Sequence, residues 1–244
     1  MHESKPKVLL GVLAKNAERF LPNLYSQFLN LTYPRHLLSV AFLESDSEDS
    51  TLQTLQENIK PGLLSKGFSR VDILSHNFGF LLLPSQRHIP SIQNDRYRCL
   101  ARSRQMVVDK FLKDNDYLFW VDVDFEYIPP DIINALLKFN VDIVSPPLYL
   151  RDGSLYDLST SRDGKTLKDL PDEELLEVDH INAVALISRR VFERGVNYID
   201  LIDSHDQEGG IFSQVAIAKG FKLYSATRCR IIHVTYSGTN VVHV

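Results

Sequence analysis

The fold of this chain is predicted most directly by the stretch Tyr117-Leu118-Phe119-Trp120-Val121-Asp122-Val123-Asp124. Its first five residues are apolar or aromatic, which is typical of a strand buried on both faces of a parallel sheet. Ligands of open α/β sheets bind beyond the carboxyl ends of such strands. Two acids, Asp122 and Asp124, occupy alternate positions there, so both carboxylates can face one small volume. They are candidate ligands for Mg²⁺ or Mn²⁺, and the plainer interpretation is an acidic, solvated turn.

Strands and helices alternate along the chain on both sides of this stretch. Other strands are predicted over residues 8–14, 37–43, 71–74, 142–147, 178–188, 221–225 and 230–234. Helices are predicted over residues 18–31, 51–64, 97–112, 131–139, 189–195 and 211–219. Residues 76–95 form a candidate substrate loop, residues 150–177 a flexible excursion, and residues 204–210 an acidic loop. The pattern predicts one α/β domain with a mostly parallel central sheet flanked by helices.

The bulk composition excludes some classes of function. The 244 residues are 44% hydrophobic, and a formal charge of -4 is spread without a basic block. Nucleic acid and anionic membranes are therefore not expected as main partners. Cys99 and Cys229 permit at most one internal disulfide and offer no metal-ligand pair. No signal peptide or membrane-spanning run is present, so we expect a soluble protein, as a piece of an anchored protein would also be.

Arg104 is an unusual residue in the predicted helix 97–112. It lies within the apolar stripe, four residues after Leu100 and four before Val108. A buried arginine needs an anionic partner, because an unpaired buried charge is very costly. Four explanations stay open: an internal salt bridge, a side chain that reaches the surface, a ligand phosphate, or the Asp122/Asp124 pair.

Five short motifs occur in order along the chain. They are residues 11–17 (GVLAKNA), 30–34 (NLTYP), 44–51 (ESDSEDST), 100–105 (LARSRQ) and 120–124 (WVDVD). Together they resemble the GT-A-type glycosyltransferases, and in detail the fungal mannan-polymerase α-1,6-mannosyltransferases. The resemblance implies a single Rossmann-like GT-A domain, with a nucleotide-sugar-binding half at about 8–145 and an acceptor-side half at about 146–244. This chain departs from the family in having Gln105 for asparagine, no amino-terminal anchor or stem, and a glycine after Glu208.

The resemblance also implies roles for individual residues. The implied substrate-binding residues are Ala14, Lys15, Asn16, Glu44, Asp46, Arg104 and Asp122. The implied ligands of Mn²⁺ or Mg²⁺ are Asp122, Asp124 and His233. Glu208 matches the catalytic acid, and Asp206 is its rival. Plainer interpretations remain, because Glu44, Asp46 and Glu208 are suited to helix capping and His233 to an ordinary place in the core.

The implied function is metal-dependent transfer of a sugar from a nucleotide sugar to a hydroxyl group of a glycan or another acceptor. Mannose from GDP-mannose is the best match, with retention of configuration, although the sequence does not exclude an inverting enzyme in which the acid is a general base. The alternative is a non-catalytic, sugar-binding or scaffold subunit of a glycosyltransferase complex. A haloacid-dehalogenase-type phosphatase is disfavoured, because the Asp-x-Asp strand is central and Phe125 follows it. Homo- or hetero-oligomers are possible partners, and the location is either the cytoplasm or, for a domain without its anchor, the Golgi lumen.

Overall fold

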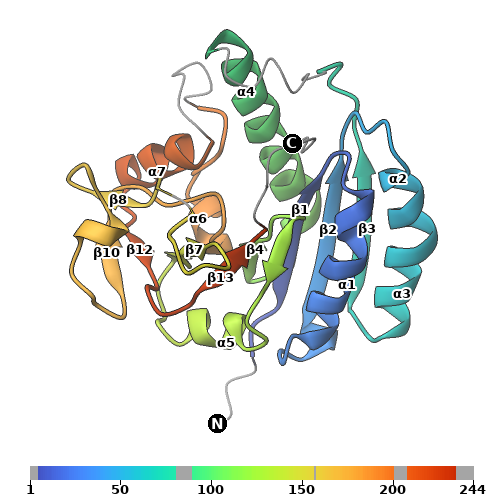
Figure 1. The fold of residues 1–244 in the computed structure, drawn as a ribbon, viewed down its shortest axis with the longest axis horizontal. Coiled ribbons are helices and arrows are strands. Elements are labelled where there is room, and N and C mark those ends of the chain that lie inside the picture. The colour runs from blue at the N-terminus through green and yellow to red at the C-terminus, as the bar shows by residue number, and fades with distance from the viewer. Residues whose placement is uncertain (1–4, 81–89, 157, 201–207, 235–244) are drawn as a thin grey trace.

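A mixed eight-stranded sheet forms the centre of the molecule (Figure 1). The computed structural model describes residues 5–80, 90–156, 158–200 and 208–234. The order of the strands across the sheet is β10-β12-β6-β11-β4-β1-β2-β3. Their bounds are β1 (Val8–Ala14), β2 (Leu38–Glu44), β3 (Arg70–Ser75), β4 (Tyr117–Trp120), β6 (Ile143–Ser145), β10 (Leu176–Val178), β11 (Leu186–Ser188) and β12 (Leu223–Ser225).

The strands β3, β2, β1 and β4 are parallel, and β11 lies antiparallel between β4 and β6. The α/β class is therefore confirmed, while the sheet is mixed rather than mostly parallel beyond β4. The chain leaves β1 in one direction to build β2 and β3, and returns on the other side of β1 as β4. Such a reversal opens a crevice at the carboxyl ends of the two strands. The rule places the expected ligand site between the carboxyl ends of β1 and β4, and we refer to this region as the crevice.

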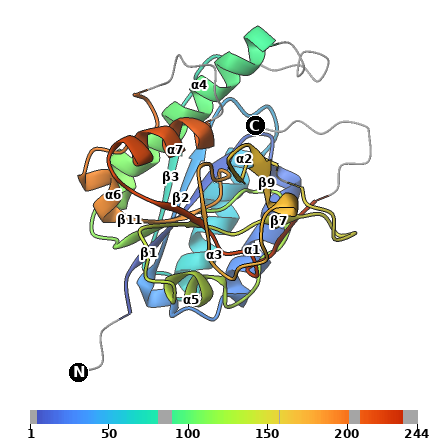
Figure 2. The same cartoon turned by 90° about the vertical axis from the view of Figure 1, so that its left-hand side faces the viewer.

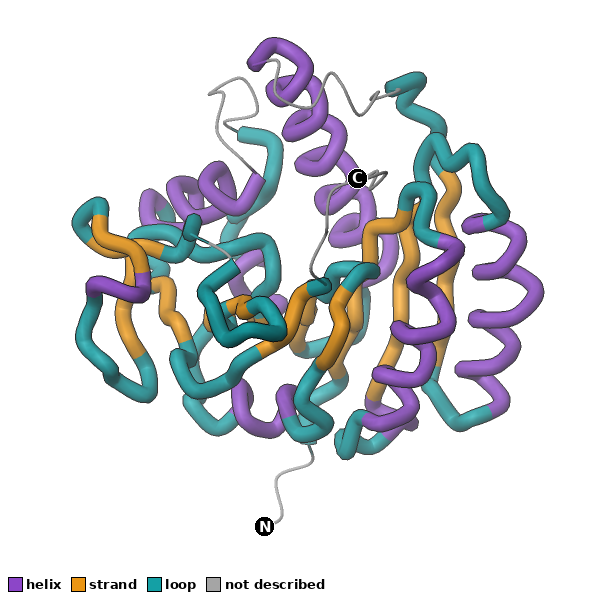
Figure 3. The backbone as a smooth tube through the Cα atoms, in the orientation of Figure 1, coloured by secondary structure: helices purple, strands orange, loops and turns teal. Residues whose placement is uncertain are grey.

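Helices cover both faces of the sheet (Figures 2 and 3). The side chains of successive strand residues belong alternately to two separate hydrophobic cores, one on each face. Val8 and Leu10 of β1 pack on one face and Leu9 on the other, as the two-residue period of a strand requires. The first face is covered by α1 (Leu21–Asn30), α3 (Lys60–Ser65) and α5 (Ile132–Leu137), and by the segment Leu55–Ile59 that follows α2 (Thr51–Thr54). The second is covered by α4 (Pro90–Val107), α6 (Arg189–Glu193) and α7 (Glu208–Ala218).

Short irregular segments complete these layers. A π-helical segment, Leu55–Ile59, joins α2 to α3, and a second one, Val108–Leu112, extends α4. Single 3₁₀ turns are formed by Glu18–Phe20, Arg35–Leu37 and Leu167–Asp169. Within the described part of the chain, no helix combines the length and the apolar character needed to cross a membrane.

A second, three-stranded sheet lies beside the central one and is the part of the fold that completes the site. Its strands are β5 (Phe125–Tyr127), β13 (Ile231–His233) and β7 (Leu148–Tyr149), in the order β5-β13-β7. His233 lies opposite Phe125 in the antiparallel pairing of β13 with β5. A separate hairpin is formed by β8 (Ser161–Arg162) and β9 (Lys165–Thr166).

Several predicted boundaries were wrong. The helix expected from residue 97 begins at Pro90, because proline fits the first turn, where its missing N–H is not needed. The strand expected over 178–188 is two strands, β10 and β11, placed apart in the sheet. The excursion 150–177 contains the β8–β9 hairpin, a 3₁₀ turn and most of β10. The helix expected over residues 51–64 runs from Thr51 to Ser65 as α2, the segment Leu55–Ile59 and α3, with Pro61 in the first turn of α3.

Candidate metal centre and donor site

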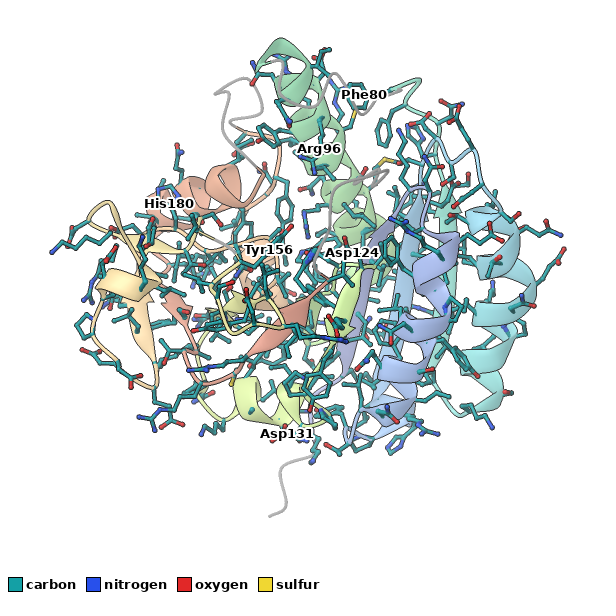
Figure 4. The ribbon with its side chains drawn as sticks, viewed as in Figure 1. Phe80, Arg96, Asp124, Asp131, Tyr156 and His180 are labelled. Atoms are coloured by element: carbon teal, nitrogen blue, oxygen red, sulfur yellow. The ribbon has the colours of Figure 1, made fainter. Side chains whose placement is uncertain are left out.

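Three potential metal ligands meet at the carboxyl end of β4. Asp122 and Asp124 lie in the turn between β4 and β5, and β13 brings His233 beside them. Asp124 is 7% exposed and His233 is 3% exposed, while Asp122 is half-buried. One ligand atom from each of the three residues lies within 4.8 Å of the other two. Figure 4 places Asp124 in the middle of the molecule, below α4.

The contacts of His233 define which ring nitrogen faces the carboxylates. Its Nδ1 lies 3.0 Å from the carbonyl oxygen of Val234, which can only accept, so Nδ1 carries the proton. Nε2 lies 3.3 Å from Oδ1 of Asp124. Burial by itself would lower the pKa of His233, but the hydrogen bond and negative charge of Asp124 outweigh it and raise the pKa above 6.5. In its neutral form, His233 directs the Nε2 lone pair toward the aspartates.

This donor set fits a divalent cation. Two carboxylates and a neutral imidazole offer oxygen and nitrogen ligands of the kind that Mn²⁺ accepts. Two buried or half-buried carboxylates this close together are expensive unless a cation compensates for their charge. The carbonyl of Val234 supplies the outer hydrogen bond that usually orients a metal-binding histidine.

Two predicted acids, Glu44 at the end of β2 and Asp46 just after it, organise the loops beside β3. Glu44 is buried, and its carboxylate accepts hydrogen bonds from the backbone N–H of Ser47 (3.0 Å) and the hydroxyl of Ser75 (2.7 Å). Asp46 has a positive φ of 50° and accepts from the N–H groups of Phe78 (3.1 Å) and Gly79 (3.0 Å). Both carboxylates therefore join the end of β2 to the end of β3, instead of capping the next helix.

The last residue of β1 and the residues that follow it belong to the same hydrogen-bond network. Ala14 accepts a backbone hydrogen bond from Ser45, and the amide oxygen of Asn16 accepts one from the N–H of Glu48 (2.7 Å). Lys15 is 8% exposed and donates from Nζ to the carbonyl of Phe80 (2.5 Å). Its burial lowers the pKa of Lys15, although the nearby carboxylates, Asp46 first among them, act in the opposite direction. The predicted donor residues thus share one edge of the sheet, and their contact with a nucleotide stays a prediction.

Arg104 lies inward, over the strand that leads to the metal ligands. Its side chain is 3% exposed, which removes the explanation that it reaches the surface. Its guanidinium carbon lies 4.4 Å from the ring centroid of Trp120, in a cation–π contact. Trp120 also packs closely against Gly11, where an added Cβ would be 2.7 Å from the indole ring. A side chain at position 11 would therefore displace Trp120.

An aromatic cluster connects this strand to α7. The indole N–H of Trp120 donates to the hydroxyl of Tyr198 (2.8 Å), and Tyr198 stacks on Phe212 of α7 with ring centroids 4.9 Å apart. The first residue of α7 is Glu208, whose backbone is described but whose side chain is not. Asp206 lies outside the described residues. Both acids remain candidates by sequence alone.

Tyr156 is a site residue that the sequence did not indicate. Its ring stacks on that of His233, with centroids 4.0 Å apart and an angle of 18° between the planes. The residue stands in a segment rich in aspartate, glycine and serine, which predicted only a flexible loop. Neither periodicity nor a motif marks it, because the contact depends on the pairing of distant strands.

Comparison with known proteins adds a family and a fold. The Anp1 family model matches residues 1–181 of this chain. A relative, the mannan polymerase II complex anp1 subunit of Schizosaccharomyces pombe, is 30% identical over 184 residues. That match covers 70% of this chain and 43% of the relative, so the chain spans less than half of that protein.

Solved structures resemble the chain over nearly its full length. Staphylococcus aureus TarS in complex with UDP-GlcNAc superposes with a TM-score of 0.63, at 14% identity, over 96% of this chain and 60% of TarS. GalNAc-T7 with UDP, GalNAc and Mn²⁺ gives a TM-score of 0.62 over 96% of this chain and 44% of that chain. These neighbours are GT-A glycosyltransferases, and the likeness shows that the chain has the same fold.

Proposed function

Because this chain belongs to the Anp1 family, we propose that it is a metal-dependent glycosyltransferase that moves a hexose from a nucleotide sugar to a hydroxyl group. The observation that carries the proposal is the meeting of Asp122, Asp124 and His233 at the carboxyl end of β4. The crevice there lies at the point where open α/β sheets bind nucleotides. Relatives named as glycosyltransferases or mannan polymerase subunits support this reaction class.

Each group of residues in the crevice would have a separate chemical role. Asp122, Asp124 and His233 would hold Mn²⁺ or Mg²⁺, which supplies Lewis acidity toward a diphosphate leaving group. Arg104, held on Trp120, would place a fixed positive charge on the same phosphates. The residues Ala14 to Asn16, with Glu44 and Asp46, would form the nucleoside side of the crevice.

The acceptor side belongs, in this proposal, to the second half of the chain, residues 146–244. Glu208, or its rival Asp206, would orient the acceptor hydroxyl toward the anomeric carbon of the donor sugar. With retention of configuration this acid stabilises the oxocarbenium-like state, and with inversion it takes the proton of the acceptor. We favour retention, as the family resemblance implies, and one-dimensional NMR of the first product identifies the anomer.

GDP-mannose is the proposed donor, since the relatives are named as subunits of mannan polymerases. The test incubates the protein with Mn²⁺ and a panel of GDP- and UDP-sugars, and measures free nucleotide. We expect the protein to release GDP from GDP-mannose. EDTA should abolish this release, and the Asp122→Ala variant should show none. Release from a UDP-sugar alone would change the donor. No release from any donor, by a folded protein, would favour the non-catalytic subunit.

Assembly and location are part of the same proposal. The names of the relatives describe subunits of complexes, so we propose that this chain also works beside another subunit. A Golgi-lumenal location is proposed on the same resemblance. Co-purification with a second family member, and localisation of the tagged full-length protein, test these two points.

A further inference from the structure

A polar cavity of about 390 Å³ lies at the edge of the central sheet opposite to the candidate metal centre. Three segments line it: the residues just before β6, the helix α6, and the turn between α7 and β12. Because β11 is antiparallel to both β4 and β6, and β12 is parallel to β6, the amino ends of β4, β6 and β12 share one edge of the sheet. The cavity lies at that edge, whereas Asp122 and Asp124 follow the carboxyl end of β4.

Basic side chains outnumber acidic ones in this cavity, which we call the basic cavity. Its charged lining residues are Arg190, Arg194, Lys219, Lys222 and Asp142. Two of the four cations have acidic partners: Nε of Arg190 lies 3.1 Å from Oδ1 of Asp142, and Nζ of Lys222 lies 2.8 Å from Oε2 of Glu177. Two positive charges therefore remain without a matching carboxylate.

The two remaining cations, Arg194 and Lys219, are brought to one rim by the packing of α6 beside α7. The rings of Phe192 and Phe212, one from each helix, have centroids 6.1 Å apart. Nζ of Lys219 lies 3.7 Å from the position that a Cβ on Gly195 would take, so the ammonium group reaches the residue next to Arg194. Within the described part of the chain, neither cation forms an ion pair. Like charges on one rim repel each other, and a bound anion would compensate for both.

The plainer explanation is that both cations stabilise the carboxyl ends of helices. Arg194 is the C-cap of α6, and Lys219 follows the last residue of α7, where positive charge interacts favourably with the helix dipole. However, α6 has only five residues, and its dipole is correspondingly small. Among the described residues, Nζ of Lys219 donates to no carbonyl group of its own helix and lies beside the end of α6 instead.

A phosphate group fits this arrangement better than a carboxylate. A phosphate ester presents three acceptor oxygens in different directions, while the two oxygens of a carboxylate lie in one plane. The basic cavity offers cations from two separate segments, α6 and the turn after α7. Arginine binds two phosphate oxygens with its planar fork, and lysine adds a compact charge. Both Arg194 and Lys219 are exposed, so a ligand can reach them.

We propose that the basic cavity binds the phosphate group of a phosphorylated small molecule or of a lipid headgroup, with Arg194 and Lys219 as its direct ligands. The site is separate from the crevice and does not depend on the proposed function. No basic block of sequence marks it, because its cations come from two segments that are far apart along the chain.

The experiment measures the binding of inorganic phosphate and pyrophosphate by calorimetry and by ¹H–¹⁵N NMR. Low salt preserves the electrostatic contribution, and EDTA keeps the candidate metal centre out of the measurement. Arg194→Gln/Lys219→Gln is compared with Lys165→Gln/Arg228→Gln, a matched control that removes two exposed cations outside the cavity. Thermal unfolding establishes that each variant is folded, and the single variants replace the double variant if it is not.

We expect Arg194→Gln/Lys219→Gln to weaken phosphate and pyrophosphate binding by at least about tenfold, the usual value of a charge-assisted hydrogen bond. The control should bind both anions like the parent, and Mn²⁺–GDP affinity should be unchanged in both double variants. A parent that binds neither anion, or equal losses in the two double variants, would overturn the proposal. A lower unfolding midpoint with parent-like phosphate affinity would also overturn it, in favour of the helix-dipole explanation.

Vesicles distinguish the two sources of the phosphate group. Flotation is measured with phosphatidylcholine vesicles, with and without phosphatidylinositol 4-phosphate. Binding to the phosphoinositide vesicles that Arg194→Gln/Lys219→Gln loses would identify a lipid headgroup. Phosphate binding without vesicle binding would identify a soluble phosphorylated compound, and both results support the site. Vesicle binding by a parent that does not bind phosphate would refute it, because a general surface attraction would then be sufficient.

Discussion

Asp122 and Asp124 are separated by Val123, whose buried side chain anchors the turn in the core. We expect Asp122→Ala and Asp124→Ala each to weaken Mn²⁺–GDP binding by at least about 100-fold, because even outer-shell partners of a metal cost about 10- to 100-fold. His233→Ala should have the same effect. Calorimetric titration with Mn²⁺ and GDP measures the loss. Asp131→Ala is the matched control, since that exposed aspartate lies at the lower edge of Figure 4, far from Asp124.

The thermal unfolding midpoint of Asp122→Ala should stay at or above that of the parent, because removing this half-buried carboxylate relieves its repulsion with Asp124 in the metal-free protein. Parent-like affinity in the folded aspartate variants would refute the metal centre. Loss of affinity in Asp131→Ala as well would point to a general effect on stability.

Two arginines of α4, one buried and one exposed, test whether the inward-facing side chain binds the nucleotide sugar. Arg104 is 3% exposed and lies over Trp120, whereas Arg102 is exposed on the opposite side of the helix. We expect Arg104→Ala to weaken binding of the nucleotide sugar by about 10- to 100-fold, the usual value of a charge-assisted hydrogen bond. Arg102→Ala should change it by less than about threefold. Equal and small effects would show that Arg104 only stabilises the packing around Trp120.

At the scale of the elements, α7 is positioned by its contact with the aromatic cluster. Phe212 stacks on Tyr198, and Tyr198 receives the hydrogen bond of Trp120, so the helix that begins at Glu208 is tied to the strand that ends before Asp122. The link joins α7 to β4, and the role of Glu208 in the crevice stays a prediction.

We expect Glu208→Gln to leave Mn²⁺–GDP binding unchanged and to lower kcat by about 10²- to 10⁴-fold, because it removes a charge that acts in the transition state and keeps the shape of the side chain. Steady-state kinetics with GDP-mannose and mannobiose measures this. In the companion variant, Asp206→Asn, we expect kcat to fall by less than about threefold. If the two variants exchange behaviour, the acid is Asp206.

At the scale of the whole molecule, Tyr33 joins the connection between α1 and β2 to the chain just before β1. Its hydroxyl donates to the carbonyl of Pro6 (2.6 Å), and the residue is 2% exposed. Burial, and then the charge of Asp116, raise the pKa of Tyr33 to about 12. The folded protein therefore holds this proton more tightly than the unfolded chain, whose tyrosines titrate near pH 10.

This difference in pKa predicts how the stability of the protein changes at alkaline pH. The raised pKa of Tyr33 contributes to the free energy of unfolding, and this contribution is fully present below pH 10. It is lost as the pH rises toward about 12, because only the unfolded chain releases the proton in that range. We expect Tyr33→Phe to be less stable than the parent by about 1 kcal/mol at pH 8, and the difference to shrink at pH 11. Urea unfolding at both pH values measures it. A difference that is the same at pH 8 and pH 11 would contradict the assignment.

Most of the framework was predictable from local patterns. The apolar runs of β1, β2 and β4 appeared as strands because burial on both faces selects apolar side chains at every position. The inward direction of Arg104 followed from helical spacing, since residues four apart lie on one face. The order of the motifs along the chain led to the GT-A fold, which the solved neighbours share.

What the sequence by itself determined is therefore the class of the elements, their order, and the residue types offered at the strand ends. Only the tertiary structure decided the antiparallel place of β11 and the stacking of Tyr156 on His233, whereas the grouping of His233 with the two aspartates was already implied by the family resemblance. The physical reason is that periodicity reports whether a side chain is buried and not against what. Strand partners and registers are set by closing long loops around a shared core, and no local stretch of sequence contains that information.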